Sequence, residues 1–319
     1  MGSPLRLVIE ADEDTADRAW AALVAEVEAA EAALSRHRDG SELVALARGG
    51  AGPVRPSRRL RAALVAAERA RRVTGGRFDP RVLADLERLG DVAVPLTDRR
   101  RPTLNGPLVL AEPGRPRRDP ALVVPAPLDF GGIGKGLALR WGARAVAAAT
   151  PGRPFLVEAG GDLVAGGGQG SGAGWPVGIE DPLAVIGPPE VPGAPEAPGL
   201  TAAVPAEPLA VVDLRAALCT SSIVRRRWRA PDGRPVHHLV DPRTGEPGGE
   251  GLLAVTVAHA DPAWAEVWSK VLFLAGAAGA PGLARSRGLA AWWVEVDGAL
   301  GMTPAARPLT AWERPRATA

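Results

Sequence analysis

The chain has 319 residues, of which 46% are hydrophobic and 23% are charged, a composition typical of a globular protein with a buried core. Its 38 basic and 36 acidic residues give a formal net charge of +2, so the pI near 9.3 lends little support to nucleic-acid binding, and we expect none. The single cysteine, Cys219, excludes an internal disulfide and a cysteine-based metal cluster.

The first residues do not read as a targeting segment. They contain one apolar run, at 7–9, and acidic residues follow at Asp12, Glu13 and Asp14. A signal peptide needs a longer apolar region, and no run in the chain reaches the length of a membrane span. We therefore expect no membrane span and a cytoplasmic location.

The chain begins with a predicted strand at 5–10 and a predicted helix at about 14–34. Apolar residues recur along this helix at alternating spacings of three and four, which predicts one buried face. That face consists of Trp20, Leu23, Val27, Ala30 and Leu34. Either Asp12 or Asp14 can cap the start of the helix.

Further elements follow in an irregular alternation. Helices are predicted at 57–72, after residue 136 and at 262–275. Strands are predicted at 122–128, 155–157, 175–179, 209–214 and 253–258, and a hairpin with an Asp-Gly turn near 297. A weakly ordered stretch is expected at 94–120, and a loop rich in proline, alanine and glycine at 183–208. This pattern favours a mixed α+β class, and we treat residues 1–319 as one domain.

A glycine-rich segment at 129–136 lies between a predicted strand and a predicted helix. It lacks the glycine and the Ser/Thr that a Walker A loop requires, and it does not fit the dinucleotide fingerprint. Open backbone N–H groups at a helix start can bind an anion, but a merely tight turn explains the glycines equally well. Lys135 adds a positive charge here, and it is one of only two lysines in the chain, the other being Lys270.

Several segments, in this order, resemble the ApbE family, the FAD:protein FMN transferases. They are Ser41-Glu42-Leu43, Gly75-Gly-Arg-Phe-Asp79, Asp129-Phe-Gly-Gly-Ile-Gly-Lys-Gly136, Gly160-Gly-Asp162, Thr220-Ser221 and His237-His-Leu-Val-Asp-Pro-Arg-Thr-Gly245. The resemblance implies an α+β, T-fold-like mixture of sheet and helix, with a flavin site between two lobes. It also implies that FAD is a substrate whose FMN part is moved to a Thr or Ser of an acceptor flavoprotein, with release of AMP.

The resemblance further implies roles for individual residues. The flavin site would be lined by Met1, His37, Arg77, Phe78 and Asp79. FAD would be contacted by Asp129, Lys135, Gly160, Gly161, Asp162, Thr220, Ser221 and His238. Because an imidazole titrates near neutral pH, we expect His238 to transfer the proton in the reaction.

The chain departs from the family at the expected magnesium site. Gly132 would supply a carbonyl ligand, but Glu266 stands where the family has an aspartate and Lys270 where it has a threonine. A protonated lysine has no lone pair to give a metal, so we hypothesise that the Lys270 ammonium replaces magnesium and neutralises the FAD pyrophosphate. Alternatively, Glu266 and Lys270 form an ordinary ion pair four residues apart on one helix.

Two further functions stay open at this stage. One is a non-catalytic protein that binds or carries FAD, since the altered metal site puts transferase activity in question. The other is an FAD hydrolase that yields FMN and AMP with water as the acceptor.

Overall fold

A computed structural model describes residues 4–49, 54–91, 95–100, 102, 104, 106–108, 110–111, 122–124, 126–167, 174–186 and 207–315. In these ranges no helix combines the length and the apolar character that a bilayer crossing requires.

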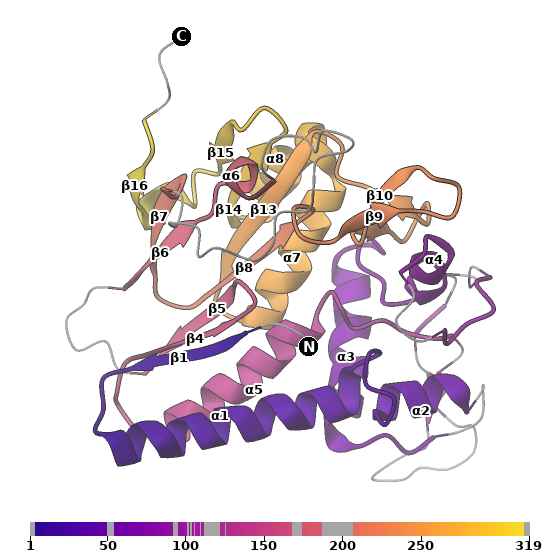
Figure 1. Cartoon of the computed structure of the whole chain (residues 1–319), viewed down its shortest axis with the longest axis horizontal. Coiled ribbons are helices and arrows are strands. Elements are labelled where there is room, and N and C mark those ends of the chain that lie inside the picture. Colours follow the sequence, from indigo (N-terminus) through magenta and orange to yellow (C-terminus); the bar gives the residue numbers. More distant parts are fainter. Residues whose placement is uncertain are drawn as a thin grey trace, which may run out of the picture.

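A seven-stranded antiparallel sheet forms the centre of the fold (Figure 1). In spatial order its strands are β1 (Leu5–Ile9), β4 (Phe155–Ala159), β5 (Asp162–Gly166), β8 (Ala217–Ser222), β13 (Leu252–His259), β14 (Ala290–Glu295) and β15 (Leu300–Met302). The predicted hairpin is formed by β14 and β15, and Gly298 in its turn has a φ of 85°. Strand β13 lies between β8 and β14, so its side chains are largely buried.

Helices cover one face of this sheet. They are α1 (Glu13–Leu34), α5 (Gly134–Ala149), α7 (Pro262–Leu274) and α8 (Gly276–Ser286). The Asp12 carboxylate caps α1 by accepting a hydrogen bond from the Thr15 N–H at 2.9 Å, one of the two predicted caps. Leu23 of α1 packs with Leu139 and Phe155 in a core cluster.

One side chain of the predicted α1 face was placed wrongly. Trp20 is 41% exposed, whereas Ala19 and Leu23 are fully buried. The reason is that adjacent helical residues point about 100° apart, and the buried stripe passes through Ala19 rather than Trp20.

The opposite face of the large sheet carries a three-stranded sheet. It consists of β16 (Thr310–Glu313), β7 (Ala210–Leu214) and β6 (Trp175–Ile179), with the 3-10 turn η1 (Arg307–Leu309) beside it. Val212 and Leu214 of β7 share a core cluster with Trp292 of the large sheet. Two layers of sheet therefore enclose this second core.

A second group of elements lies beside these layers (Figure 1). It contains α2 (Glu42–Arg48), α3 (Arg58–Val73), α4 (Leu83–Arg88) and the pairs β2 (Leu110–Ala111) with β3 (Leu122–Val123), β9 (Arg227–Arg229) with β10 (Pro235–His237), and β11 (Val240–Asp241) with β12 (Glu246–Pro247). Leu60 and Leu64 of α3 point inward as predicted, and they join the same core cluster as Val267 of α7.

Some predicted boundaries are wrong for identifiable reasons. The strand predicted at 122–128 is reduced to Leu122–Val123, because prolines at 125 and 127 cannot donate to a ladder. The start of the loop predicted at 183–208 is helical instead, in α6 (Pro182–Ile186), and residues 187–206 lie outside the described ranges. Most of the stretch at 94–120 also lies outside them.

Candidate functional site

The glycine-rich segment joins β3 to the start of α5. Asp129 holds its first turn, since its carboxylate accepts a hydrogen bond from the Gly131 N–H and its own N–H donates to the Pro80 carbonyl at 2.7 Å. Gly136 allows α5 to approach α7, because a Cβ there would lie 2.5 Å from both Ala263 Cα and Pro262 O. At Gly136, therefore, the close packing of α5 against α7 explains why the residue is a glycine.

Glu266 of α7 caps the start of α5. Its Oε2 accepts a hydrogen bond from the Gly136 N–H at 2.7 Å, and Ile133 at the N-cap offers no side-chain cap of its own. The side chain is only 3% exposed, and its Oε1 has no hydrogen-bond partner among the described residues. Burial raises the pKa of Glu266 to about 7, although the Lys135 charge acts in the opposite direction.

Lys135, in the first turn of α5, forms an ion pair with Asp162. The distance between Lys135 Nζ and Asp162 Oδ2 is 2.5 Å, and Asp162 Oδ1 accepts from the Thr220 N–H at 3.0 Å. Burial alone would lower the pKa of Lys135, but the Asp162 and Glu266 carboxylates together outweigh it and raise that pKa. The pair therefore fixes an ammonium between the glycine-rich segment, β5 and β8.

Lys270 lies directly against the glycine-rich segment. A Cβ at Gly132 would be 2.7 Å from Lys270 Cε and 3.0 Å from Phe78 Cε2, so the glycine leaves room for the lysine side chain. In the part of the chain that the structure describes, the Lys270 ammonium makes no hydrogen bond and no ion pair. The alternative of an ion pair with Glu266 is therefore not realised. Burial lowers the pKa of Lys270, and the Glu266 charge counteracts this effect.

His238 follows the β9–β10 hairpin. Its ring Nδ1 and its backbone N–H both lie 3.3 Å from the Arg226 carbonyl oxygen. A carbonyl can only accept, so the proton belongs on Nδ1, and Nε2 carries the free lone pair. Burial, together with the charges of Lys270 and Arg226, holds the pKa of His238 well below its usual value. The ring is therefore neutral at pH 7 and able to accept a proton.

Thr220 and Ser221 point to opposite faces of β8, as strand geometry requires. Thr220 is exposed, and its hydroxyl lies 2.9 Å from that of Thr256. Ser221 is 5% exposed, and its hydroxyl pairs with Ser269 of α7 at 2.9 Å. Ser221 therefore lies on the face of β8 that α7 covers, and the Thr220 side chain lies on the other face.

The turn between β4 and β5 exposes backbone beside Asp162. Gly160 and Gly161 have φ values of 59° and 85°, which side chains adopt only with strain. No atom lies within 4 Å of a Cβ built on Gly161, so the turn is open on that side.

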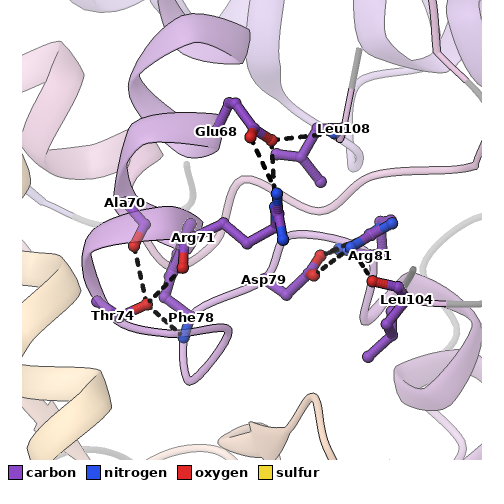
Figure 2. A network of polar contacts seen from close by, with 9 residues as sticks. All are labelled: Glu68, Ala70, Arg71, Thr74, Phe78, Asp79, Arg81, Leu104 and Leu108. Atoms are coloured by element: carbon purple, nitrogen blue, oxygen red, sulfur yellow. Dashed lines mark hydrogen bonds and ion pairs between the residues drawn. The ribbon is translucent and has the colours of Figure 1, made fainter. Parts of the chain in front are cut away.

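The turn at 74–81 is held by internal contacts (Figure 2). The Thr74 hydroxyl donates to the Ala70 carbonyl at 2.8 Å and accepts from the Phe78 N–H at 3.1 Å. The Asp79 carboxylate is bound at both oxygens by Arg81, which is 2% exposed. Asp79 is therefore committed to the fold of this turn, whereas Arg77 is half-buried with its side chain partly open to solvent.

Charged residues that the sequence analysis did not single out border the site. Arg36, in the loop after α1, is 6% exposed and binds both Asp129 and Asp91. The neighbouring His37 is exposed, and Met1 lies outside the described residues. No sequence motif marks Arg36 or Asp91; their unusual burial appears only in three dimensions.

Nine of the predicted residues gather in one neighbourhood. Contacts or electrostatic effects on their pKa values link them, and they are Phe78, Asp129, Gly132, Lys135, Asp162, Thr220, His238, Glu266 and Lys270. Asp79 and Ser221 are bound within the protein instead.

The residues at the expected metal position do not fit magnesium. Magnesium prefers six oxygen ligands in octahedral geometry. Here one Glu266 oxygen is occupied by the Gly136 N–H, and the Lys270 side chain covers Gly132. Within the described ranges, no three His, Cys, Asp or Glu side chains are grouped so that they could hold an ion. The arrangement supplies a fixed positive charge instead.

Comparisons with known proteins agree with this architecture. A segment of 89 residues is 32% identical to the FAD:protein FMN transferase of Escherichia coli K12 and 30% identical to the protein of that name from Klebsiella pneumoniae. It makes up 28% of this chain and 25% of each relative, so the chain matches only a quarter of their length.

Solved structures share the fold over nearly the whole chain. The ApbE protein of Thermotoga maritima has a TM-score of 0.77 at 22% identity, covering 98% of this chain and 97% of its own. The flavin transferase ApbE of Vibrio cholerae has a TM-score of 0.68 at 20% identity, covering 96% and 100%. The expected mixture of sheet and helix is confirmed. The sequence model of the ApbE family matches residues 1–293, and the chain therefore belongs to the ApbE family.

Proposed function

We propose that this protein moves FMN from FAD to a Thr or Ser hydroxyl of an acceptor flavoprotein and releases AMP. The observation that carries the proposal is the Lys270 ammonium, which has no partner among the described residues and lies against Gly132 next to the Lys135–Asp162 pair. Such a site suits the pyrophosphate of a dinucleotide, since a positioned cation forms charge-assisted hydrogen bonds with phosphate oxygens. The names of the bacterial relatives support FAD as the substrate.

The reaction needs one proton acceptor and one source of positive charge. His238 Nε2 takes the proton from the acceptor hydroxyl, and the resulting oxygen attacks the FMN-side phosphorus. A new P–O bond forms, the bond between that phosphorus and the bridging oxygen breaks, and AMP leaves with the bridging oxygen. Negative charge on the phosphoryl oxygens is the main barrier in such transfers, and positioned cations lower it.

Lys270 takes the part that the family resemblance gives to magnesium. Its ammonium neutralises the FAD pyrophosphate directly, and binding of this anion favours the charged form of the lysine despite its burial. Glu266 is then a capping residue of α5 rather than a metal ligand.

The remaining residues bind the two ends of FAD. Asp129, Gly160, Gly161, Asp162 and Thr220 surround the nucleotide, whereas His37 and Arg77 line the flavin. Phe78 is buried next to Gly132 and supports the glycine-rich segment from the core. Asp79 and Ser221 support the site through their internal partners, Arg81 and Ser269.

A second candidate is a protein that binds FAD without transferring it. The poor fit of the Glu266 and Lys270 positions to magnesium favours this candidate. A protein that has lost the metal and has no substitute for it would still bind FAD but would not transfer FMN. Hydrolysis of FAD to FMN and AMP is the third candidate, with water entering in place of the acceptor hydroxyl.

Flavin fluorescence on a denaturing gel separates these functions. The protein is incubated with FAD and with two acceptor proteins that other family members modify, in magnesium or in EDTA, and free AMP is measured in parallel. We expect a fluorescent acceptor band and AMP in both conditions. AMP without a band would identify a hydrolase. Neither product, with FAD still bound, would identify a binding protein.

A further inference from the structure

A chain of four charged side chains runs along the candidate site. Arg226 binds Asp91 at 2.9 Å, Asp91 binds Arg36 at 2.6 Å, and Arg36 binds Asp129 at 2.7 Å. Positive and negative side chains alternate in this row of ion pairs, and each of the two carboxylates binds two donors. The Asp91 Oδ2 accepts from both arginines, while the Asp129 carboxylate also accepts from the Gly131 N–H.

The four residues come from separate segments. Arg36 stands in the loop after α1, next to His37, and Asp91 follows α4. Arg226 precedes β9, and its carbonyl oxygen fixes the ring of His238. Asp129 begins the glycine-rich segment. One chain of ion pairs therefore connects the proposed proton acceptor with the segment that Lys270 covers.

Arg36 is the central member, and its chemistry cannot be replaced easily. Its Nε binds Asp129 and its NH2 group binds Asp91, so one planar guanidinium spans two carboxylates. An ammonium at the same place is a single point and cannot reproduce this fork. The side chain is 6% exposed, and Asp129 is 7% exposed, so loss of the arginine would leave a buried carboxylate without its cation.

We propose that Arg36 is a positioning residue for FAD: through Asp129 and Asp91 it sets the glycine-rich segment and the His238 segment at the spacing that one bound dinucleotide requires. Arg36 itself does not touch the substrate. The proposal rests on FAD as the ligand, and it predicts that FAD binding fails when Arg36 is removed although Lys270 and His238 are intact.

The test compares Arg36→Met, Arg36→Lys and Asp91→Asn with the wild type. The matched control is Arg59→Met, which removes an arginine whose 2.7 Å ion pair with Glu26 joins α3 to α1 outside the site. FAD affinity is measured by flavin fluorescence, and hydrogen–deuterium exchange is followed in peptides covering 129–136 and 226–238.

We expect Arg36→Met to raise the Kd for FAD at least tenfold and to accelerate exchange in both segments together. Arg36→Lys should restore part of the affinity, and Asp91→Asn should add little in the Arg36→Met background, because both act through one network. Arg59→Met should change neither readout.

Wild-type affinity in Arg36→Met, or faster exchange confined to the residues around position 36, would overturn the proposal. Should Arg36→Met fail to fold, Arg36→Lys and Asp91→Asn give the same comparison. Should the wild type not bind FAD, the proposed function fails, and the coupled exchange of the two segments still decides whether Arg36 positions them.

Discussion

Lys270 is a half-buried cation that finds no partner in the described part of the chain, and such a group is costly unless an anion neutralises it. The neighbouring charged side chains are engaged, since Lys135 pairs with Asp162 and Glu266 accepts from the Gly136 N–H. Among these side chains, the Lys270 ammonium is therefore stabilised most when an anion binds in the site. This reasoning makes Lys270 the residue on which FAD affinity should depend most.

Lys270→Met is expected to weaken FAD binding by roughly tenfold to a hundredfold, because a charge-assisted hydrogen bond contributes about 1.5–3 kcal/mol. Added magnesium should not restore the affinity. Titration of FAD followed by fluorescence measures the effect, and Arg285→Met, which removes an exposed arginine of α8, serves as the control. Unchanged affinity in Lys270→Met would show that its ammonium does not face the pyrophosphate.

Glu266 is a second ionisable group of the site whose charged form is disfavoured by burial. Its pKa is about 7 in the folded protein, against an ordinary value of 4.5. Between these two pH values the folded state binds more protons than the unfolded state, so the free energy of unfolding falls as pH rises through this window. At neutral pH the titration of Glu266 lowers the free energy of unfolding by at most about 3 kcal/mol.

Glu266→Gln removes this titration and keeps an oxygen that can accept from the Gly136 N–H. We expect the stability of the variant to exceed that of the wild type increasingly from pH 5 to pH 8, as measured by urea unfolding. His237 and His238, whose pKa values are lowered, are present in both proteins, so the difference reports the Glu266 carboxyl together with its effect on Lys270. Parallel stability curves would contradict the assignment.

At the scale of elements, the site depends on the close contact of α5 with α7. Gly136 permits this contact, since a side chain there would meet the backbone of Pro262 and Ala263 rather than a flexible group. The same approach brings Glu266 to the start of α5 and Lys270 to Gly132.

Gly136→Ala should therefore destabilise the protein by about 2–3 kcal/mol, because backbone atoms cannot yield as side chains do. Gly282→Ala is the control, since a Cβ at Gly282 of α8 meets nothing within 4 Å, and helix propensity favours alanine there by up to about 1 kcal/mol. Chemical denaturation of both variants measures the difference. Equal stabilities of the two variants would contradict this expectation, because they would show that α5 and α7 can move apart at little cost in free energy.

The sequence predicted long periodic elements well and local ones poorly. Helix α1 and strand β7 carry clear apolar periodicity, and their predicted spans agree closely with the structure. The helix predicted at 262–275 ends at Leu274, and the unpredicted α8 begins at Gly276, whose φ of 69° turns the chain. The short strands β9 to β12 were missed because two or three residues hold no detectable period.

At the scale of the whole molecule, the sequence could name site residues but not their partners. Thr220 and Ser221 were predicted together, and strand alternation places their side chains on opposite faces of β8, a point that the sequence already contained. The links Arg36–Asp91 and Gly132–Lys270 join residues far apart in the chain, and only the packed fold brings them together. The family resemblance identified the candidate site residues, and the structure showed which of them are in contact.

The most direct test of the account is the affinity for FAD in EDTA and in excess magnesium, measured by calorimetry on the wild-type protein. A site neutralised by Lys270 should give the same Kd in both conditions, and Lys270→Met should weaken it in both. Binding that appears only with magnesium would contradict the central claim, because a divalent ion and not the lysine would then neutralise the pyrophosphate.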